Sequence, residues 1–224
     1  MAEEAISAGQ WAALFDLDGV LIDSSEIHAG SWVQVFRPYG IELPPERLHR
    51  QEGRRSLDIA YGIIEDFGLK ITRSALDELI ERKREIYRRS APRGLRTDAT
   101  AALEILGTAG WILGLVTGSV RKNVETALHG DELGVFDVVI TAESYSRSKP
   151  DPEPYLTACR EIGVVPARCV VIENAPLGIA SACAAGMRVV ALTSTLPESD
   201  LQGADAVIDD LTELPQLLRS FRQA

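Results

Sequence analysis

The chain has 224 residues, of which 46% are hydrophobic and 25% are charged, enough apolar material for one medium-sized domain or for one domain carrying a smaller one. Its formal net charge of −10 repels nucleic acid and anionic membrane surfaces, which excludes both as partners and favours a small polar ligand. An anionic ligand would have to be attracted by local cations or by a metal ion.

The cysteines and the N-terminal residues indicate a compartment. Cys159, Cys169 and Cys183 are odd in number and have no CxxC spacing, which argues against a disulfide framework and against a zinc site. The N-terminal stretch MAEEAISAGQ is acidic where a signal peptide is basic, and the apolar run after it is too short to cross a bilayer. We therefore expect a cytoplasmic protein, with a monomer as the default state.

The first predicted element is a short buried strand over 11–15, directly followed by Asp16 and Asp18. Residues 24–90 have helical periods and no convincing strand, so they are expected to form a small all-helical domain. In its last helix, Ser74 and Asp77 fit a capping box. Apolar residues form a stripe along that helix, namely Leu76, Leu79, Ile80, Ile86 and Tyr87.

After this insert, strands and helices alternate to the end of the chain. Near-continuous apolar runs predict strands buried on both faces at 111–117, 136–140, 168–173, 188–192 and 206–209. One helix is expected to begin at Ser119 and stop at Gly130, and another to begin at Asp151 and Pro152 and run to Gly163. The alternation predicts an α/β fold with a doubly wound parallel sheet, built from residues 1–23 and 91–224.

Residues that follow the predicted strands carry the chemistry. Ligands of open α/β sheets bind beyond the carboxyl ends of the strands, so these residues are expected to share one crevice. They are Asp16, Asp18, Thr117, Gly118, Ser119, Lys149, Glu173 and Asn174. Carboxylates suit Mg²⁺, and a hydroxyl-glycine turn at a helix start can present N–H groups to a phosphate. The set therefore predicts a divalent cation and a phosphate group bound together, with Lys149 neutralising charge.

Four motifs, DLDGV, TGS, KPDPEPY and VIENAPLGIASACAAGM, resemble those of the haloacid dehalogenase superfamily in its phosphatase and β-phosphoglucomutase branch. The resemblance covers essentially the whole chain and implies a Rossmann-like core with a helical cap inserted after the first strand. It implies that Asp16 is a nucleophile forming an aspartyl-phosphate, and that Asp18 is general acid and then base. Thr117 and Lys149 would hold the phosphoryl group.

The same resemblance implies a Mg²⁺ site on the Asp16 carboxylate, the Asp18 backbone carbonyl and the pair Glu173 and Asn174. The family pattern commonly has Glu-Asp at that pair, so one formal negative charge is missing here. An asparagine can still ligate through its amide oxygen, and Glu173 can contact the metal directly or through water. We therefore expect a lower metal affinity than in relatives with an acidic pair.

Residues in the helical insert are candidates for substrate selection. Lys83 interrupts the apolar stripe of the last helix, and His28 shares a face of the first helix with Trp32, Val35 and Tyr39. Both fall where β-phosphoglucomutase-like proteins carry cleft-facing Lys and His residues. Alternatively, Lys83 extends from the edge of its stripe to solvent and His28 is a core residue. Arg54 and Arg55 could add a contact for a second anionic group.

Three functions are compatible with these residues. The first is a Mg²⁺-dependent phosphatase acting on a small phosphorylated metabolite, such as a sugar phosphate or phosphoglycolate. The second is a sugar phosphomutase that shares every core residue and returns the phosphoryl group to another hydroxyl. The third is a noncatalytic module that binds metal or phosphate. Intact Asp16, Asp18, Thr117 and Lys149 argue against the third, and we expect hydrolysis.

Overall fold

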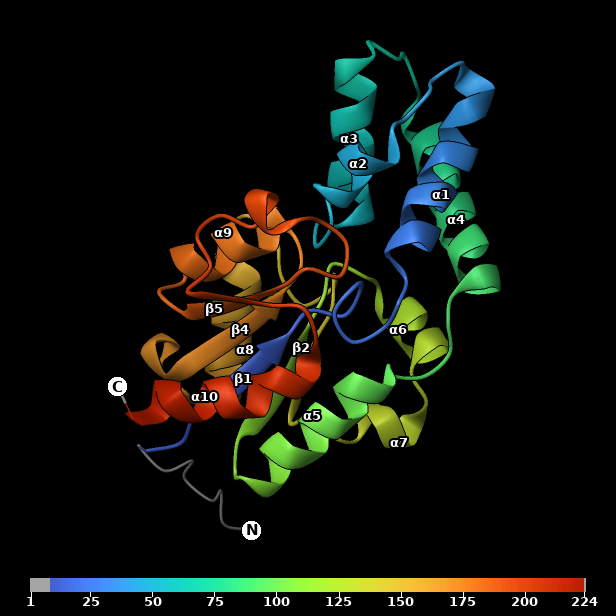
Figure 1. The fold of residues 1–224 in the computed structure, drawn as a ribbon. Helices are drawn as coiled ribbons and strands as arrows, with labels where there is room; N and C mark the ends of the chain where they lie inside the picture. Colours follow the sequence, from blue (N-terminus) through green and yellow to red (C-terminus); the bar gives the residue numbers. More distant parts are fainter. Residues whose placement is uncertain (1–8, 224) are drawn as a thin grey trace.

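Six parallel strands form one sheet in the order β3-β2-β1-β4-β5-β6 in the computed structural model, which describes residues 9–223 (Figure 1). The strands are β1 (Ala12–Phe15), β2 (Ile112–Val116), β3 (Val138–Ile140), β4 (Cys169–Glu173), β5 (Arg188–Leu192) and β6 (Ala206–Ile208). Each coincides with a predicted apolar run, so the predicted α/β fold with a parallel sheet is confirmed. Most of the acidic N-terminal stretch, from which a compartment was inferred, lies outside the described residues.

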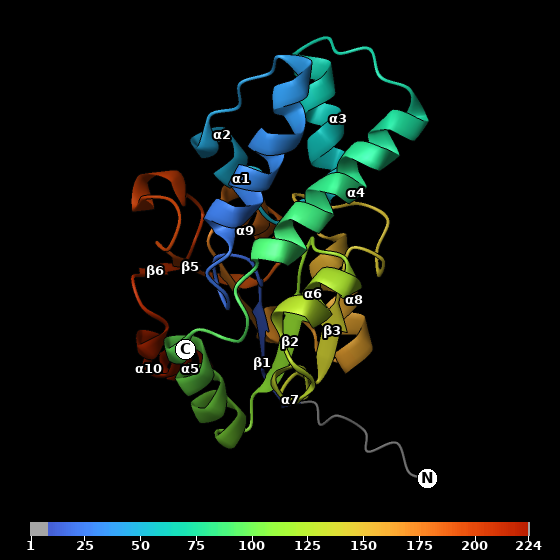
Figure 2. The same ribbon diagram turned by 90° about the vertical axis from the view of Figure 1, so that its right-hand side faces the viewer.

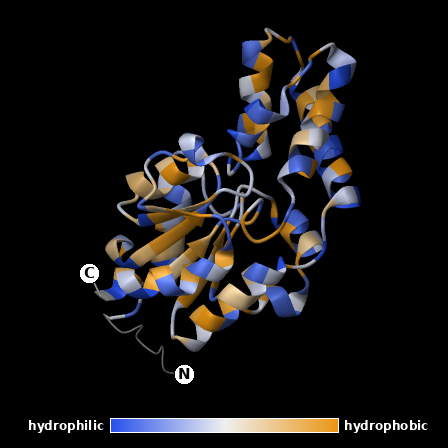
Figure 3. Cartoon of the chain, viewed as in Figure 1, coloured by the Kyte–Doolittle hydropathy of each residue, from blue (hydrophilic) through white to orange (hydrophobic). Residues whose placement is uncertain are grey.

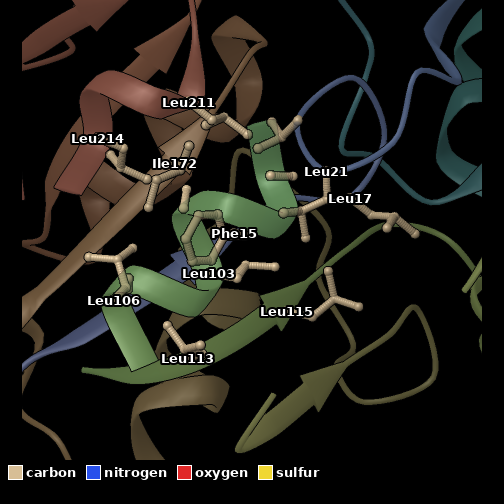
Figure 4. Close-up of a cluster of buried hydrophobic side chains, with 14 of the residues drawn as sticks. Phe15, Leu17, Leu21, Leu103, Leu106, Leu113, Leu115, Ile172, Leu211 and Leu214 are labelled. Atoms are coloured by element: carbon tan, nitrogen blue, oxygen red, sulfur yellow. The ribbon is translucent and has the colours of Figure 1, made fainter. Parts of the chain in front are cut away.

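The sheet is apolar because helices cover both of its faces. Every residue of β1, β2 and β4 is buried, and the strands stand out as hydrophobic in Figure 3. One face packs against α5 (Thr97–Thr108), α6 (Arg121–Ala127) and α10 (Leu214–Gln223), and the other against α8 (Glu153–Ile162) and α9 (Pro176–Ala184). Figure 4 shows the first of these clusters, in which Phe15 lies between Leu103 and Ile172. Shorter helices connect these layers: α7 (Gly130–Leu133), η2 (Pro166–Arg168), η3 (Glu198–Asp200) and η4 (Leu211–Glu213).

Four helices between β1 and α5 form a second body, which we call the cap (Figures 1 and 2). They are α1 (Ser25–Phe36), α2 (Pro45–His49), α3 (Ser56–Asp66) and α4 (Arg73–Ser90), with the short turn η1 (Arg37–Tyr39) after α1. The cap has a hydrophobic cluster of its own, in which Trp32 and Phe36 of α1 lie with Ile63 of α3 and Leu79 of α4. Such a separate cluster lets the cap keep its structure while its position over the core changes.

Several predicted helix ends were wrong, because the serines expected to cap them bond elsewhere. Thr72 caps α4 by accepting a hydrogen bond from the Ala75 N–H at 3.3 Å, whereas Ser74 bonds Glu78 at 3.2 Å. Helix α6 begins at Arg121, and the Ser119 hydroxyl bonds Asp18 instead.

Two further details also differ from the sequence analysis. Gly130 begins α7 rather than ending α6. Tyr39 lies in η1 and is 43% exposed, so it does not share the buried face of His28. The helix expected over 151–163 is α8, which ends at Gly163 in the left-handed conformation (φ +69°). Within residues 9–223, no helix combines the length and the apolarity that crossing a bilayer requires.

Candidate active site

The ends of three neighbouring strands bring the predicted core residues together. Asp16 and Thr117 each continue the hydrogen bonding of the sheet by one residue, with N–H bonds of 3.0 Å to the carbonyls of Ile172 and Ile140. Asp16, at the end of the central strand, therefore lies between the segments that follow β2 and β4. Both side chains are almost fully buried, with 1% of each residue exposed.

Lys149 joins all three of these strand ends. Its Nζ lies 2.7 Å from Asp16 Oδ1 and 2.6 Å from Glu173 Oε1, and it also donates to the Val116 carbonyl at 3.2 Å. Burial opposes a charge on Lys149, but the two carboxylates raise its pKa well above the ordinary value, so the ammonium group stays charged. One cation thus faces two buried carboxyl groups.

Glu173 is engaged by Lys149 and by the helix after β4. Its Oε1 also accepts a hydrogen bond from the Tyr155 hydroxyl at 2.7 Å, and its Oε2 accepts one from the Asn174 N–H at 3.1 Å. A Cβ atom on Gly178 of α9 would lie 1.8 Å from Glu173 Oε1, so the carboxylate fits only against a glycine. These contacts suit a residue that fixes Lys149, and metal contact through Glu173 stays a prediction.

Asp18 has a different set of partners, all of them neutral or cationic. Its Oδ1 accepts hydrogen bonds from Ser24 at 2.6 Å and Tyr87 at 3.2 Å, and its Oδ2 accepts one from Ser119 at 2.9 Å. His28 Nε2 lies 3.0 Å from Asp18 Oδ1. Burial alone would raise the pKa of Asp18, but His28 and the serine hydroxyls hold it well below the ordinary value. Asp18 is therefore a carboxylate in this state.

His28 and Lys83 extend this network into the cap. Lys83 Nζ lies 2.5 Å from His28 Nδ1, and the imidazole stacks on Tyr87 with ring centroids 4.1 Å apart. Lys83 is 2% exposed, and its Nζ lies 5.2 Å from the centroid of the Trp32 ring, so it does not extend to solvent. Burial lowers its pKa to about 7. The interpretation of Lys83 as a side chain that extends to solvent is therefore wrong, and a role of His28 in substrate selection stays a prediction.

A small cavity lies where the cap meets the core. It has a volume of about 40 Å³ and is lined in part by Asp18, His28, Arg54, Lys83, Gly118 and Ser119. All six were singled out from the sequence. Arg55 is not among the residues that line it and pairs with Asp58 at 2.9 Å.

The turn at Thr117 and Gly118 lies directly beneath the cap loop, by which we mean residues 50–55 between α2 and α3. Thr117 Oγ1 accepts the Ser119 N–H at 3.0 Å, which fixes the turn. A Cβ atom on Gly118 would lie 2.5 Å from the Gly53 carbonyl oxygen, so the close approach of the loop requires a glycine. The loop thus closes the cavity from above.

The expected Mg²⁺ site was tested against the polar atoms around Asp16. Among residues 9–223, no group of three or more His, Cys, Asp and Glu side chains is arranged to hold a metal ion. Two oxygens of the expected ligands are nevertheless buried without a hydrogen-bond partner in that part of the chain: Asp16 Oδ2 and Asn174 Oδ1. Buried acceptors without partners are costly, and hard oxygens are what Mg²⁺ binds, so these residues fit the ion.

Asn174 does not cap the helix that follows it. Helix α9 has Ala175 at its N-cap position, and the Asn174 amide points to the cap instead. Its Nδ2 donates to Glu52 Oε2 at 2.8 Å and to Thr195 Oγ1 at 2.9 Å. Glu52 was missed in the sequence, although the arginines two and three residues further on were singled out.

Comparison with known proteins agrees with this geometry. The chain belongs to the haloacid dehalogenase-like hydrolase family, whose model matches residues 13–192. Over 210 residues it is 36% identical to validoxylamine A 7′-phosphate phosphatase of Streptomyces hygroscopicus subsp. limoneus, covering 90% of this chain and 94% of the relative. It is 30% identical to hexitol phosphatase A of Escherichia coli, with 90% and 91% covered. The predicted family and enzyme class are confirmed.

A solved structure gives the same fold. A candidate β-phosphoglucomutase from Bacteroides vulgatus superposes with a TM-score of 0.83 at 28% sequence identity, covering 97% of this chain and 91% of that one. The similarity extends over sheet and cap together. The Rossmann-like core expected from the motifs is therefore confirmed.

Proposed function

We propose that the protein is a Mg²⁺-dependent phosphatase that acts on a small polyhydroxylated phosphate ester through an aspartyl-phosphate. The observation that carries this proposal is the pairing of two buried carboxylates with opposite surroundings. Asp16 is held by Lys149 at 2.7 Å, whereas Asp18 is surrounded by hydroxyls and His28. Such a division suits one nucleophile and one proton-transfer group. The named phosphatases among its relatives support the same reaction.

The proposed reaction has two steps. An Asp16 oxygen attacks phosphorus, and the bond from phosphorus to the ester oxygen breaks while Asp18 gives that oxygen a proton. Water then attacks the aspartyl-phosphate, Asp18 accepts the proton of the water, and inorganic phosphate leaves. Because Asp18 is a carboxylate in the closed state, the proton for the first step has to reach it from its surroundings, and His28 Nε2 at 3.0 Å is the adjacent group.

Positive charge has to offset the repulsion between Asp16 and a phosphate dianion. Lys149 supplies one charge, but it is shared with Glu173. Asp16 and Asn174, with the Asp18 carbonyl, would hold Mg²⁺, and the ion when bound would screen the phosphoryl oxygens. The Thr117 hydroxyl and the N–H group of Gly118 are proposed to bind the same oxygens.

The cavity limits what the closed enzyme holds. A volume of about 40 Å³ has no room for a hexose phosphate, so such a substrate enters only when the cap is raised. Lys83 and Arg54 line the cavity and provide cations for a polar leaving group. The free thiols of the three cysteines agree with a reducing cytoplasm, which we propose as the compartment.

A panel of phosphate esters tests the proposal. Hexitol phosphates, fructose 1-phosphate, β-glucose 1-phosphate, phosphoglycolate and nucleotides would be assayed for phosphate release with Mg²⁺ and with a chelator. We expect release from at least one polyol or sugar phosphate, loss of release with the chelator, and loss in Asp16→Asn by a factor of at least about 10⁴. Circular dichroism would show that the variant is folded. Turnover by the variant would disprove the nucleophile.

A mutase is the second candidate, because His28 of the cap contacts Asp18 and is itself contacted by Lys83. β-Glucose 1-phosphate supplied with a bisphosphate primer separates the two. A mutase would form glucose 6-phosphate, whereas the proposed phosphatase would release inorganic phosphate.

A further inference from the structure

Glu52 of the cap and Asn174 of the core meet beside the proposed metal site. Glu52 lies in the loop between α2 and α3, and its Oε2 accepts a hydrogen bond from Asn174 Nδ2 at 2.8 Å. Both residues are buried, with Asn174 fully enclosed. The bond joins positions 122 residues apart, one in each body of the molecule.

This bond fixes which way the Asn174 amide points. An ionised carboxylate only accepts hydrogen bonds, so the NH₂ end of the amide has to face Glu52. Thr195 Oγ1 accepts the second N–H at 2.9 Å. The amide oxygen is therefore directed away from Glu52, and it has no partner within residues 9–223. Without Glu52, the amide could turn over and present its NH₂ group to the cation.

Glu52 is itself held by residues of the cap. His49 Nδ1 lies 3.0 Å from its Oε1, and the Ser25 hydroxyl donates to its Oε2 at 3.0 Å. The hydrogen bond that His49 donates to Glu52 raises the pKa of His49, which favours a positive charge beside the carboxylate. Residues of the cap therefore fix the position of the Glu52 carboxylate before the cap closes on the core.

An aspartate at position 174 would conflict with this arrangement. Its carboxylate oxygen would replace the NH₂ group at 2.8 Å from Glu52, and two like charges would be buried in contact. The asparagine is thus explained by its neighbour in the cap. The negative charge that position 174 lacks lies instead on Glu52, one hydrogen bond further away.

The contact has to break in every catalytic cycle. Asp16, Thr117, Lys149 and Asn174 are each at most 1% exposed, and the loop after Glu52 lies on Gly118 so closely that a side chain there would clash. No phosphate ester can reach Asp16 until this loop lifts. Lifting it separates Glu52 from Asn174.

We infer that Glu52 is a positioning residue: only when the cap is shut does it turn the Asn174 amide so that Oδ1 faces the divalent cation. Metal binding and cap closure are then coupled, and each favours the other. The inference rests on the proposed function only in placing Mg²⁺ at Asn174. Asn174→Asp is therefore expected to open the cap instead of simply restoring a ligand.

Two measurements without substrate test this inference. Hydrogen–deuterium exchange of residues 48–58 reports cap closure, and isothermal titration with Mg²⁺ reports metal affinity. We expect Asn174→Asp to speed exchange by about tenfold or more, because of the buried like charges. The double variant E52Q/N174D should return to within about threefold of the wild type, because the amide introduced in the cap can donate to the carboxylate introduced in the core. Glu52→Ala should weaken Mg²⁺ binding by about three- to tenfold, the loss of one buried hydrogen bond.

The ion pair of Arg50 with Asp200 provides the matched control. It also joins cap and core, at 2.8 Å, but it is partly exposed and does not touch Asn174. Asp200→Asn should change exchange and Mg²⁺ affinity by less than about threefold. The inference is overturned if Asn174→Asp stays as closed as the wild type, or if E52Q/N174D stays as open as Asn174→Asp. If the variants behave as expected but the wild-type protein releases no phosphate from any ester, only the proposed function is overturned.

Discussion

The core and the cap contribute charged groups to the same cavity in two different ways. In the core, Lys149 contacts Asp16 at 2.7 Å and Glu173 at 2.6 Å, and both carboxyl groups lie at the ends of neighbouring strands of one sheet. In the cap, His28, Lys83 and Glu52 come from two helices and a loop, and they meet the core through Asp18 and Asn174. Groups on the sheet are suited to the chemical step, and groups on the cap to deciding when and on what it occurs.

Removing the core cation should have the largest effect. Lys149→Met leaves Asp16 and Glu173 buried without a cation, and removing one partner from a buried ion pair costs about 3–5 kcal/mol. We expect urea unfolding to show this loss and phosphatase activity to fall below detection. Lys122→Met, on the exposed surface of α6, is the control and should change neither. A stable Lys149→Met protein would show that the two carboxyl groups do not need a cation between them.

Asp18 belongs to the core but is contacted by residues of the cap, so we expect its replacement to have an intermediate effect on activity. Asp18→Asn is expected to lower phosphate release by roughly 10² to 10⁴, the usual contribution of a general acid–base group. Because the pKa of Asp18 is lowered in the folded protein, its ionisation stabilises the fold above about pH 4 and this stabilisation is lost as the pH falls further. The variant should thus be less stable than the wild type at pH 7, and the difference should shrink in acid. A pH-independent difference would contradict the assigned charge.

Replacing the buried lysine of the cap should cost least in the chemical step. Lys83→Met should reduce turnover of a sugar phosphate more than turnover of a generic aryl phosphate, since Lys83 lines the cavity and is proposed to contact the leaving group. Equal losses with both substrates would show that Lys83 does not select the substrate.

Lys83→Met is also expected to change the stability of the protein. Burial lowers the pKa of Lys83 to about 7, so the unfolded chain binds the extra proton between about pH 7 and 10.5 and wild-type stability rises over that range. Lys83→Met lacks this penalty, and we expect it to be more stable than the wild type by about 1–4 kcal/mol near pH 6. The gain should diminish above pH 7, as measured by urea unfolding at pH 6 and 9.

The difference between the two regions also governs what the sequence predicts. The six strands were found because burial on both faces makes them continuously apolar, a local signal. The core residues followed from the rule that strand ends share one edge, and the motifs added their proposed roles. Helix starts were less predictable: Ser119 has the composition of a cap, but its hydroxyl bonds Asp18 from 101 residues away.

Contacts across the two bodies could not be read from local patterns. No motif or periodic pattern in the sequence singles out Glu52, and only the folded chain brings it within hydrogen-bonding distance of Asn174. Tyr87 was assigned to an apolar stripe, yet its hydroxyl bonds Asp18 at 3.2 Å. The structure shows that position 53 requires a glycine, because φ is +80° and a side chain there would meet Lys149, whereas the sequence shows only a glycine next to Glu52. An acidic residue beside such a glycine merits inspection.

The central place of β1 has a consequence for biosynthesis. Ala12 pairs with Ile112 on one side and with Cys169 on the other, so β1 finds its two partner strands only after the chain has grown by a further 100 and 157 residues. The cap, whose cluster spans residues 29–80, can meanwhile form from consecutive segments. A nascent chain therefore carries an unpaired apolar strand beside a formed cap, and we expect holding chaperones to bind β1 during that interval.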